Sequence, residues 1–425
     1  MANKHQPYPE YKNSKVEWLR DIPVDWDIFD GKRLFKNRRE LSLKTDEQLA
    51  ASQKYGVVPQ SLMMKLNDSK VMLALKGTNS FRHVEKNDFV ISLRSFQGGI
   101  EHSNYIGCVS PAYTVLSATK NITPNFYKYL FKSNSYISAL QSTTDSLRDG
   151  KSITFDQFGA IPLVFPNTKE QEKIANFLDY ETAKIDTLIE KQEQLIKLLK
   201  EKRQAVISHA VTKGLNPNAP MRDSGVEWLG EVPEHWEVKR LKFVCNLISK
   251  KSEIGTKKAI ALENIESWTG RFIPTDSTYS GEDVEFSTGD VLFGKLRPYL
   301  AKVYLAEEVG IAFGDILVYR PKSKLNSKYC FYQMFNEAFI KTIDSTTYGS
   351  KMPRASADFI SNMQVALPPI SEQEAISDHI ESILNSFDSI GIKAKTAINF
   401  MQERRTALIS AAVTGKIDVR NWQPS

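Results

Sequence analysis

The chain contains a long-range internal repeat. Residues 14–26 have the pattern Ser-x-Val-Glu-Trp-Leu-x-x-x-Pro-x-x-Trp, and residues 224–236 repeat all seven specified positions at an offset of 210. Four of the six tryptophans of the chain lie in these two segments, so chance does not explain the match. Solenoid proteins have much shorter periods, of roughly 20–50 residues. The repeat therefore indicates a duplicated module.

Two further pairs of segments match at an offset of 202. Pro166–Ile174 and Pro368–Ile376 share the pattern Pro-x-x-x-Glu-Gln-Glu-x-Ile, and Glu201–Thr212 matches Glu403–Thr414. The order of the matching segments is the same in both copies. We therefore predict a globular domain followed by a helix, then a second domain and helix, related by a pseudo-twofold axis as in a dimer made from one polypeptide.

The segments 168–213 and 371–414 are predicted to be long helices. Thr168 stands three positions before Gln171, which is the spacing of a helix capping box. Each segment follows a proline and ends at a glycine in the C-cap position. These residues are Pro166 and Gly214 for the first segment, and Pro368 and Gly415 for the second.

Apolar residues recur with heptad spacing along both helices, so each needs a partner, and the simplest partner is the other helix. When the heptad register of the second helix is shifted by 202 residues onto the first helix, the a and d positions of the first helix are more polar. Ile189 and Ile196 widen its apolar stripe. Helices of this length form a rod of roughly 60 Å. The predicted a and d positions of the second helix are Gln373, Ile376, Ile380, Ile383, Phe387, Ile390, Ala394, Ala397, Met401, Arg404, Leu408 and Ala411.

The domain interiors mix short β-rich runs with aromatic-rich helical segments, which favours a mixed α/β, or α+β, fold. We predict globular domains at residues 1–166 and 215–368, an antiparallel coiled coil formed by helices at 167–214 and 369–415, and a C-terminal tail at 416–425.

The composition favours a cytoplasmic protein. Cys108, Cys245 and Cys330 are scattered and odd in number, which excludes a disulfide framework and a zinc site built from cysteines, and fits a reducing compartment. The apolar runs are too short to span a membrane. Residues 1–15 contain no apolar signal-peptide region.

The sequence shows no recognisable catalytic motif. It contains no G-x-x-x-x-G-K-[ST] phosphate loop and no H-E-x-x-H, and its histidines lack metal-ligand spacing. Pro233–Lys239 loosely resembles an acidic nuclease cluster, but the equivalent Pro23–Phe29 has no lysine. We therefore expect no catalytic, cofactor-binding or metal-binding residue in this chain.

Charge and loop composition point toward nucleic acid. The net charge of +6 resides in residues 1–165, which hold 22 Lys and Arg against 16 Asp and Glu, although many proteins with such a charge bind no nucleic acid. Loops rich in basic, amide, aromatic and glycine residues recur at matching places in both copies. Such side chains suit base edges and phosphates. A single loop of this kind is more simply a solvated surface, so the argument rests on the recurrence.

The paired tryptophan motifs, the Glu-Gln-Glu helix starts and the Ala-Val-Thr helix ends resemble the specificity subunit of type I restriction–modification enzymes over essentially the whole chain. The resemblance implies two target-recognition domains, each reading one half of a bipartite site on double-stranded DNA. It implies a non-catalytic chain that docks two modification (adenine methyltransferase) subunits, which bind S-adenosylmethionine. Restriction subunits, which hydrolyse ATP and cleave DNA, join that core.

The loops of the two copies differ, so the predicted target is asymmetric, because a perfect twofold protein reads a palindrome. The helices are expected to set the gap between the half-sites. Arginine, lysine, glutamine and tyrosine in the loops are the candidates for contacts with bases. The predicted DNA-binding residues are Arg94, Gln97, Arg148 and Lys151 in the first domain, and Arg297, Tyr348, Lys351 and Arg354 in the second.

Three alternatives remain open. The specificity subunit of a related restriction–modification system that does not depend on ATP would have much the same sequence. A coiled-coil scaffold without DNA contact is disfavoured by the basic loops. A stand-alone enzyme is disfavoured by the missing motifs.

Overall fold

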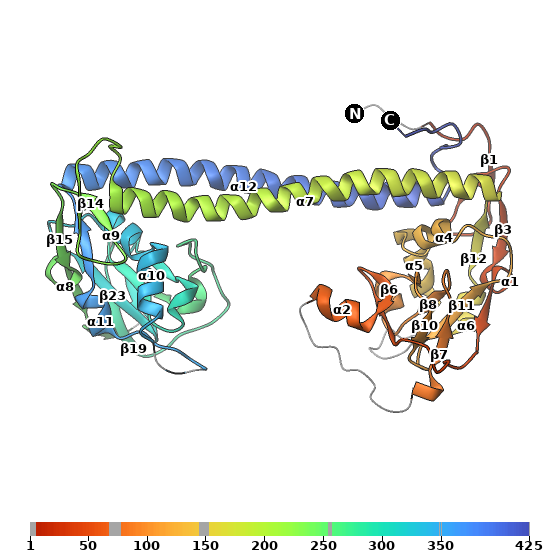
Figure 1. The fold of residues 1–425 in the computed structure, drawn as a ribbon, viewed down its shortest axis with the longest axis horizontal. Coiled ribbons are helices and arrows are strands. Elements are labelled where there is room, and N and C mark those ends of the chain that lie inside the picture. The colour runs from red at the N-terminus through yellow and green to blue at the C-terminus, as the bar shows by residue number, and fades with distance from the viewer. Residues whose placement is uncertain are drawn as a thin grey trace. The chain divides into compact units, whose positions relative to one another are not determined.

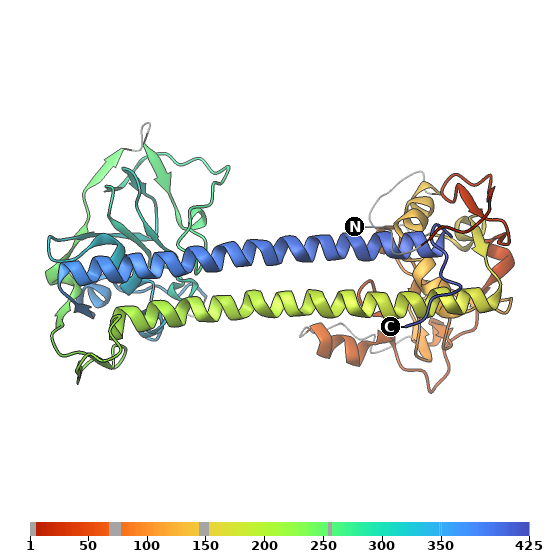
Figure 2. The same cartoon turned by 90° about the horizontal axis from the view of Figure 1, so that it is seen from above.

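The structure is a computed structural model that divides into two compact units (Figures 1 and 2). Unit 1 comprises Met1–Lys191 and Thr396–Ser425, and unit 2 comprises Gln192–Lys395. Each unit contains one globular domain, called domain 1 or domain 2 below, and parts of both long helices. The structure describes residues 6–67, 78–143, 153–253, 257–347, 349 and 351–424.

Domain 1 is built on an antiparallel four-stranded sheet with the strand order β4-β11-β8-β9. These strands are β4 (Phe35–Arg38), β11 (Thr114–Ala118), β8 (Phe89–Ile91) and β9 (Glu101–His102). Four strand pairs surround the sheet: β1 (Tyr11–Asn13) with β2 (Asp21–Pro23), β3 (Asp27–Asp30) with β12 (Pro162–Phe165), β5 (Leu49–Ser52) with β6 (Gly56–Pro59), and β7 (Arg82–Val84) with β10 (Gly107–Val109). The helices are α1 (Gly31–Leu34), α2 (Gln60–Asn67), α3 (Ser95–Gly98), α4 (Pro124–Leu130), α5 (Asn134–Ser142) and α6 (Phe155–Gly159), with a 3₁₀ turn, η1 (Thr78–Ser80).

Domain 2 repeats this sheet with the strand order β16-β23-β20-β21. Its strands are β16 (Cys245–Ile248), β23 (Ile316–Pro321), β20 (Val291–Gly294) and β21 (Val303–Leu305). A second sheet has the order β17-β19-β22-β18, from β17 (Lys251–Glu253), β19 (Glu282–Phe286), β22 (Gly310–Ala312) and β18 (Lys258–Ile260). The pairs β13 (Met221–Asp223) with β14 (Glu231–Pro233), and β15 (Glu237–Arg240) with β24 (Gln364–Leu367), complete the strands. The helices are α8 (Leu241–Val244), α9 (Ser327–Met334), α10 (Glu337–Asp344) and α11 (Ala357–Asn362), with 3₁₀ turns η2 (Leu262–Asn264) and η3 (Pro298–Leu300).

The predicted fold class is confirmed, since both copies have the same mixed architecture and each is followed by a long helix. These helices are α7 (Thr168–Lys213) and α12 (Ile370–Val413). They end at Gly214 and Gly415, whose φ values of +73° and +72° confirm the predicted glycine C-caps.

The two long helices run antiparallel within each unit (Figure 2). In unit 1, Ile174 near the start of α7 shares a buried core with Val413 at the end of α12. In unit 2, Val211 near the end of α7 shares a core with Ile376 near the start of α12. The helix ends are therefore part of the hydrophobic core of each domain.

The predicted heptad register is half right. Among the predicted a positions, Ile380 and Ala394 are buried as expected, while Phe387, Met401 and Leu408 are half-buried. After Ile376, which is buried as predicted, the d positions lie one residue further along the chain: Ile390 is 41% exposed, whereas Leu384, one residue after the predicted Ile383, is 7% exposed. The same shift leaves Leu188 of α7 exposed. The sequence pattern is misleading here because Gly391, Arg203 and Arg405 lie in the contact between the two helices. None of them is apolar, so a search for apolar residues at heptad spacing does not find these positions.

The repeated tryptophans and the repeated helix starts meet in the structure. The Trp26 indole Nε1 donates a 3.0 Å hydrogen bond to the Glu170 carboxylate, which also accepts one of 2.7 Å from the Tyr8 hydroxyl. In unit 2, the Trp236 Nε1 donates to Glu372 over 3.1 Å. Both tryptophans are almost fully buried, so the carboxylate satisfies an indole N–H that water cannot reach.

The glutamine of each Glu-Gln-Glu motif fastens the chain around the helix start. The Gln171 Oε1 accepts from the Thr123 N–H at 2.8 Å, while its Nε2 donates to the Pro166 carbonyl at 2.7 Å. The predicted capping box at Thr168 is therefore wrong. The Asn167 Oδ1 caps the helix instead, because it accepts from the Glu170 N–H at 3.0 Å.

We expect the variant Glu170→Ala to destabilise unit 1 by about 2–4 kcal/mol, because two buried donors, the Trp26 N–H and the Tyr8 hydroxyl, lose their acceptor. Denaturant unfolding followed by tryptophan fluorescence would measure the loss. Glu172→Ala, an exposed glutamate two residues further along the same helix, is the matched control. Equal unfolding midpoints for the two variants would contradict this role of Glu170.

Candidate nucleic-acid interface

The structure describes five of the eight predicted DNA-binding residues. Arg148, Lys151 and Tyr348 lie outside the described residues. The remaining five fall on two surface turns, one in each domain. They are Arg94, Gln97, Arg297, Lys351 and Arg354.

In domain 1 the turn follows β8, a central strand of the sheet. Arg94 is the N-cap residue of α3, and Gln97 lies in that short helix, with its N–H donating to the Arg94 carbonyl at 2.9 Å. Both side chains are exposed. The turn therefore presents one guanidinium and one amide, which are the groups that pair with guanine and adenine edges in the major groove.

Three side chains from other parts of domain 1 hold the backbone of this turn. The Lys132 ammonium donates to the Gly98 carbonyl at 2.9 Å, the Gln141 amide to the Phe96 carbonyl at 2.7 Å, and the Gln53 amide to the Arg94 carbonyl at 3.4 Å. The bonds from Lys132 and Gln141 satisfy carbonyls at the end of α3 that have no partner within so short a helix. The turn is thus held in one conformation before any ligand arrives.

Glu101 provides the counter-charge for Lys132. Its carboxylate lies 2.5 Å from the Lys132 ammonium and is only 1% exposed. Burial raises the pKa of Glu101 to about 7, against the opposing attraction of Lys132. A buried carboxyl group therefore lies directly behind the turn at residues 94–98.

In domain 2 the structure brings three predicted residues together. Arg297 follows β20, the counterpart of β8, and has a φ of +51°. Its N–H donates to the Pro353 carbonyl at 2.8 Å, and its Nη2 lies 3.5 Å from the Lys351 carbonyl. Leu296 forms a β-bridge with Arg354. The segments 295–300 and 351–355 therefore form one surface.

Arg354 already has an acidic partner in this surface. Its guanidinium forms an ion pair of 3.0 Å with Asp315, and the Lys295 ammonium lies 3.6 Å from the same carboxylate. The hydrogen bond from Arg354 is the largest cause that holds the pKa of Asp315 below its usual range. Arg354 is still 47% exposed, whereas Arg297 has no acidic partner among the described residues. Arg297 is thus the freer of the two for contact with a base.

Sequence reasoning missed the residues that support these turns. Lys132, Gln53 and Asp315 lie far along the chain from the turns that they contact, and no motif marks them. Tyr299 is 46% exposed beside Arg297, and only its position in the same basic loop could have identified it.

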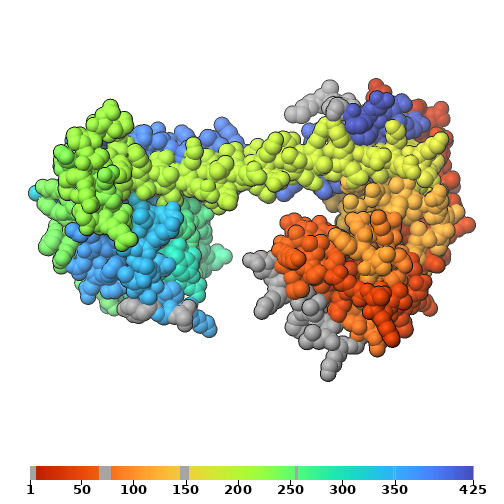
Figure 3. Space-filling model, in the orientation of Figure 1, coloured from red at the N-terminus to blue at the C-terminus, as the bar shows by residue number. Residues whose placement is uncertain are grey.

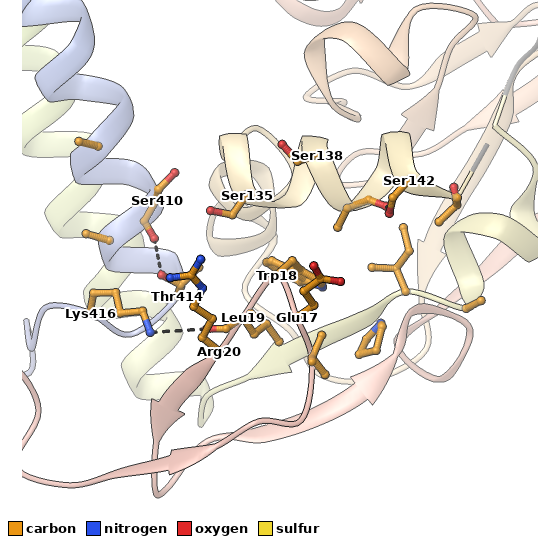
Figure 4. A pocket seen from close by; sticks show the side chains of 18 residues that line it. Glu17, Trp18, Leu19, Arg20, Ser135, Ser138, Ser142, Ser410, Thr414 and Lys416 are labelled. Carbon is orange, nitrogen blue, oxygen red and sulfur yellow. Dashed lines mark hydrogen bonds between the residues drawn. The ribbon is translucent and has the colours of Figure 1, made fainter. Parts of the chain in front are cut away.

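A second surface feature is a hollow of about 850 Å³ in unit 1 (Figure 4). Trp18 lies against it, with the serines of α5 and the end of α12 forming walls. The Lys416 ammonium at its edge donates to the Asp21 carbonyl at 2.5 Å. Its lining consists mostly of serine, threonine, alanine and apolar residues, with Glu17, Arg20 and Lys416 as the charged members.

Among the described residues, no group of three or more His, Cys, Asp and Glu side chains is placed to hold a metal ion. The nuclease-like segment Pro233–Lys239 has a structural role, since the ring Nε2 of His235 and the indole of Trp236 both contact Glu372. None of the helices in the described part of the chain is long and apolar enough to cross a lipid bilayer.

Comparison with known proteins decides the family. The family model described as "Type I restriction modification DNA specificity domain" matches twice, at residues 23–198 and 233–399, once in each copy of the repeat. The chain belongs to this family. Its function is therefore recognition of a DNA target in a type I restriction–modification system, and the specificity domain occurs twice.

Relatives of similar length have the same description. The type I restriction enzyme MjaVIII specificity subunit of Methanocaldococcus jannaschii is 24% identical over 440 aligned residues, which cover 98% of each chain. The type I restriction enzyme EcoDI specificity subunit of Escherichia coli is 26% identical over 286 residues, which cover 62% of this specificity chain and 64% of its relative.

Solved structures share the fold. A chain from a structure describing complex assembly and conformational transition of the type I R-M system superposes with a TM-score of 0.68, at 14% identity, over 92% of this chain and 98% of the other. The HsdS subunit from Thermoanaerobacter tengcongensis gives a TM-score of 0.55 at 14% identity, over 93% of this chain and 98% of the other.

Glu101 makes the stability of this specificity chain depend on pH. Because its pKa rises from 4.5 to about 7 on folding, the native state binds more protons than the unfolded state between these values. The stability that this group contributes is complete below pH 4.5 and is lost as the pH rises through about 7.

We therefore expect the unfolding free energy of the Glu101→Gln variant to fall less steeply than that of the wild type as the pH rises from 4.5 to about 7. Denaturant titrations at several pH values would measure the slopes. Glu40→Gln, at an exposed carboxylate, should keep the wild-type slope. Parallel curves for Glu101→Gln and the wild type would refute the shift.

Proposed function

We propose that each domain of this specificity chain reads one half of an asymmetric bipartite site on double-stranded DNA. The single observation that carries the proposal is the placement of different side chains on equivalent turns. The turn after β8 carries Arg94 and Gln97, and the turn after β20 carries Arg297 and Tyr299. A repeated scaffold with different reading side chains favours two different half-sites.

The long helices act as the spacer in this proposal. Each continues without interruption from one unit into the other, α7 over 46 residues and α12 over 44. The number of helical residues between the domains then sets the number of base pairs between the half-sites, because the helix rises 1.5 Å per residue.

The outward faces of the helices would dock two modification (methyltransferase) subunits. Large apolar side chains of the helices are exposed: Phe400 is 64% exposed in unit 1, and Leu198 is 55% exposed in unit 2. A face of α7 is uncovered in the space-filling view (Figure 3). Exposed apolar side chains on a helix favour a protein partner.

The chemistry would then belong to the partners. In this proposal the chain itself is not catalytic, and the methyltransferase subunits bind S-adenosylmethionine and modify an adenine in each half-site. Restriction subunits, which hydrolyse ATP and cleave DNA, join the same core in the cytoplasm. The arginine and amide groups on the reading turns support a recognition role.

The test is to express the chain with its methyltransferase partner and to map adenine methylation across a genome by single-molecule sequencing. We expect one asymmetric bipartite motif that appears only when this chain is present. Arg297→Ala should lose discrimination of about 1–3 kcal/mol at one base pair of one half-site. A palindromic motif, or methylation that does not require this chain, would refute the proposal. If Arg297→Ala instead lowers methylation equally at all sequences, Arg297 contacts a phosphate and not a base.

Docking has its own test. Phe400→Asp puts a charge on an exposed apolar position and should weaken binding of one methyltransferase subunit by at least about tenfold, with the fold unchanged. Native mass spectrometry would then show complexes that contain one methyltransferase subunit in place of two. Asn399→Asp, at the exposed neighbouring position, is the control. Full assembly of Phe400→Asp at the wild-type concentration would exclude this surface.

A further inference from the structure

A strained loop in unit 2 connects domain 2 to the long helices. The loop follows η2 and is closed by a β-bridge between Ile265 and Phe272. Trp268 has a φ of +60° and Gly270 a φ of +70°. A Cβ atom at Gly270 would lie 2.6 Å from the Phe331 ring, so the glycine is also needed for close packing. Such conformations persist only where surrounding contacts impose them, and they cluster at functional positions.

The outer end of the loop is fastened to both long helices. The Arg271 guanidinium forms an ion pair with Asp388 of α12, and Arg203 of α7 forms an ion pair with the same carboxylate. The Arg271 side chain is 53% exposed, and the Arg203 side chain is 13% exposed. One aspartate therefore joins the two helices to each other and to domain 2.

The inner part of the loop is fastened to the candidate reading turn. The Trp268 indole Nε1 donates to the Tyr299 carbonyl at 3.1 Å. Tyr299 lies in η3, directly after Arg297 and Pro298. The indole also packs on Phe335, with 6.2 Å between ring centroids. The loop thus forms a continuous connection from Asp388 to the turn that carries Arg297.

A hollow lies where the loop faces the helices. It measures about 600 Å³ and is lined by Ile196, Leu199, Trp268 and Phe387 among others. The two amide atoms of Gln204, which also lines it, are buried and have no hydrogen-bond partner in the structure. The loop and the helices are therefore not closely packed against each other at this hollow. The Arg271–Asp388 ion pair links them directly.

Unit 1 has the helix pair but lacks the same link. Asp186 and Arg405 stand 202 residues from Asp388 and Arg203, and they form the equivalent interhelix pair at 2.8 Å. Among the described residues of unit 1, no domain 1 side chain joins that pair.

We propose that the loop at residues 266–271 is a brace that fixes domain 2 on the spacer helices, and that Arg271 thereby enforces the number of base pairs between the two half-sites. This inference rests on the proposed function. Successive base pairs are about 3.4 Å apart, so a small tilt of domain 2 about its core is enough to reach a half-site that is displaced by one base pair. Arg271 is a positioning residue in this arrangement and contacts no base.

The experiment compares wild type, Arg271→Ala and Arg271→Lys, each co-expressed as the full chain with the methyltransferase partner. The measurement is genome-wide adenine methylation, sorted by the gap between the half-sites. Lys341→Ala is the matched control, because it breaks an ion pair with Glu337 inside α10 and leaves the spacer helices untouched. Native mass spectrometry of each complex shows whether assembly is intact.

We expect Arg271→Ala to keep both half-site sequences and to lower the preference for the native gap over gaps one base pair longer or shorter by roughly fivefold, in keeping with the loss of one partly exposed ion pair. Arg271→Lys should lie between wild type and Arg271→Ala, and Lys341→Ala should match wild type.

Two results would overturn the inference: an unchanged gap preference in an assembled Arg271→Ala complex, or a changed base in one half-site at an unchanged gap. A wild-type complex that methylates no bipartite motif would instead refute the proposed function.

Discussion

A carboxylate at the first turn of each long helix, buried at Glu170 and partly exposed at Glu372, accepts a hydrogen bond from a buried indole near the start of the preceding domain. Glu170 binds Trp26, and Glu372 binds Trp236. The same helix turn holds the chain on either side through Gln171 or Gln373. Because these bonds fix where each helix leaves its domain, the direction of the spacer and the orientation of the domain core follow from them.

This framework separates structure from recognition. The residues that repeat along the chain include those that join domain to helix, and the two tryptophans and two glutamines of these joints, Trp26, Trp236, Gln171 and Gln373, are buried. The residues that differ between the copies lie on exposed turns after β8 and β20, where Arg94 and Gln97 stand in one domain and Arg297 in the other. A duplicated protein can therefore change one reading turn without loss of its scaffold, because the hydrogen bonds of Trp26, Trp236, Gln171 and Gln373 that join domain to helix do not involve these turns. This separation is what a target-recognition protein needs in order to acquire new specificities.

The sequence alone predicted the duplication, the fold class, the glycine C-caps and the family, because rare tryptophans and long helices are easily recognised in a sequence. It was insufficient for the helix seam and for the cap at Asn167. Gly391, Arg203 and Arg405 occupy positions in the contact between the two helices. The two arginines pair with aspartates on the opposite helix, and such long-range contacts are not visible in a local sequence pattern. The support of the reading turns by Lys132 and Asp315 is hidden for the same reason. All eight DNA-binding residues remain predictions, and Arg148, Lys151 and Tyr348 also lie outside the described residues.

The arginine–aspartate pairs in the seam have a physical consequence beyond their modest energies. A purely apolar seam can slide by a heptad at little cost, whereas a polar pair in a seam penalises every register that separates its partners. The pairs Arg203–Asp388 and Arg405–Asp186 are equivalent in the two copies, so each unit contains its own register lock. In the proposed function, where the helices set the distance between two half-sites, a slip of one heptad would move a domain by about 10 Å, or roughly three base pairs. Charged residues make the contact between the two helices less apolar. In return they fix the register of the two helices, and a spacer of constant length requires a fixed register.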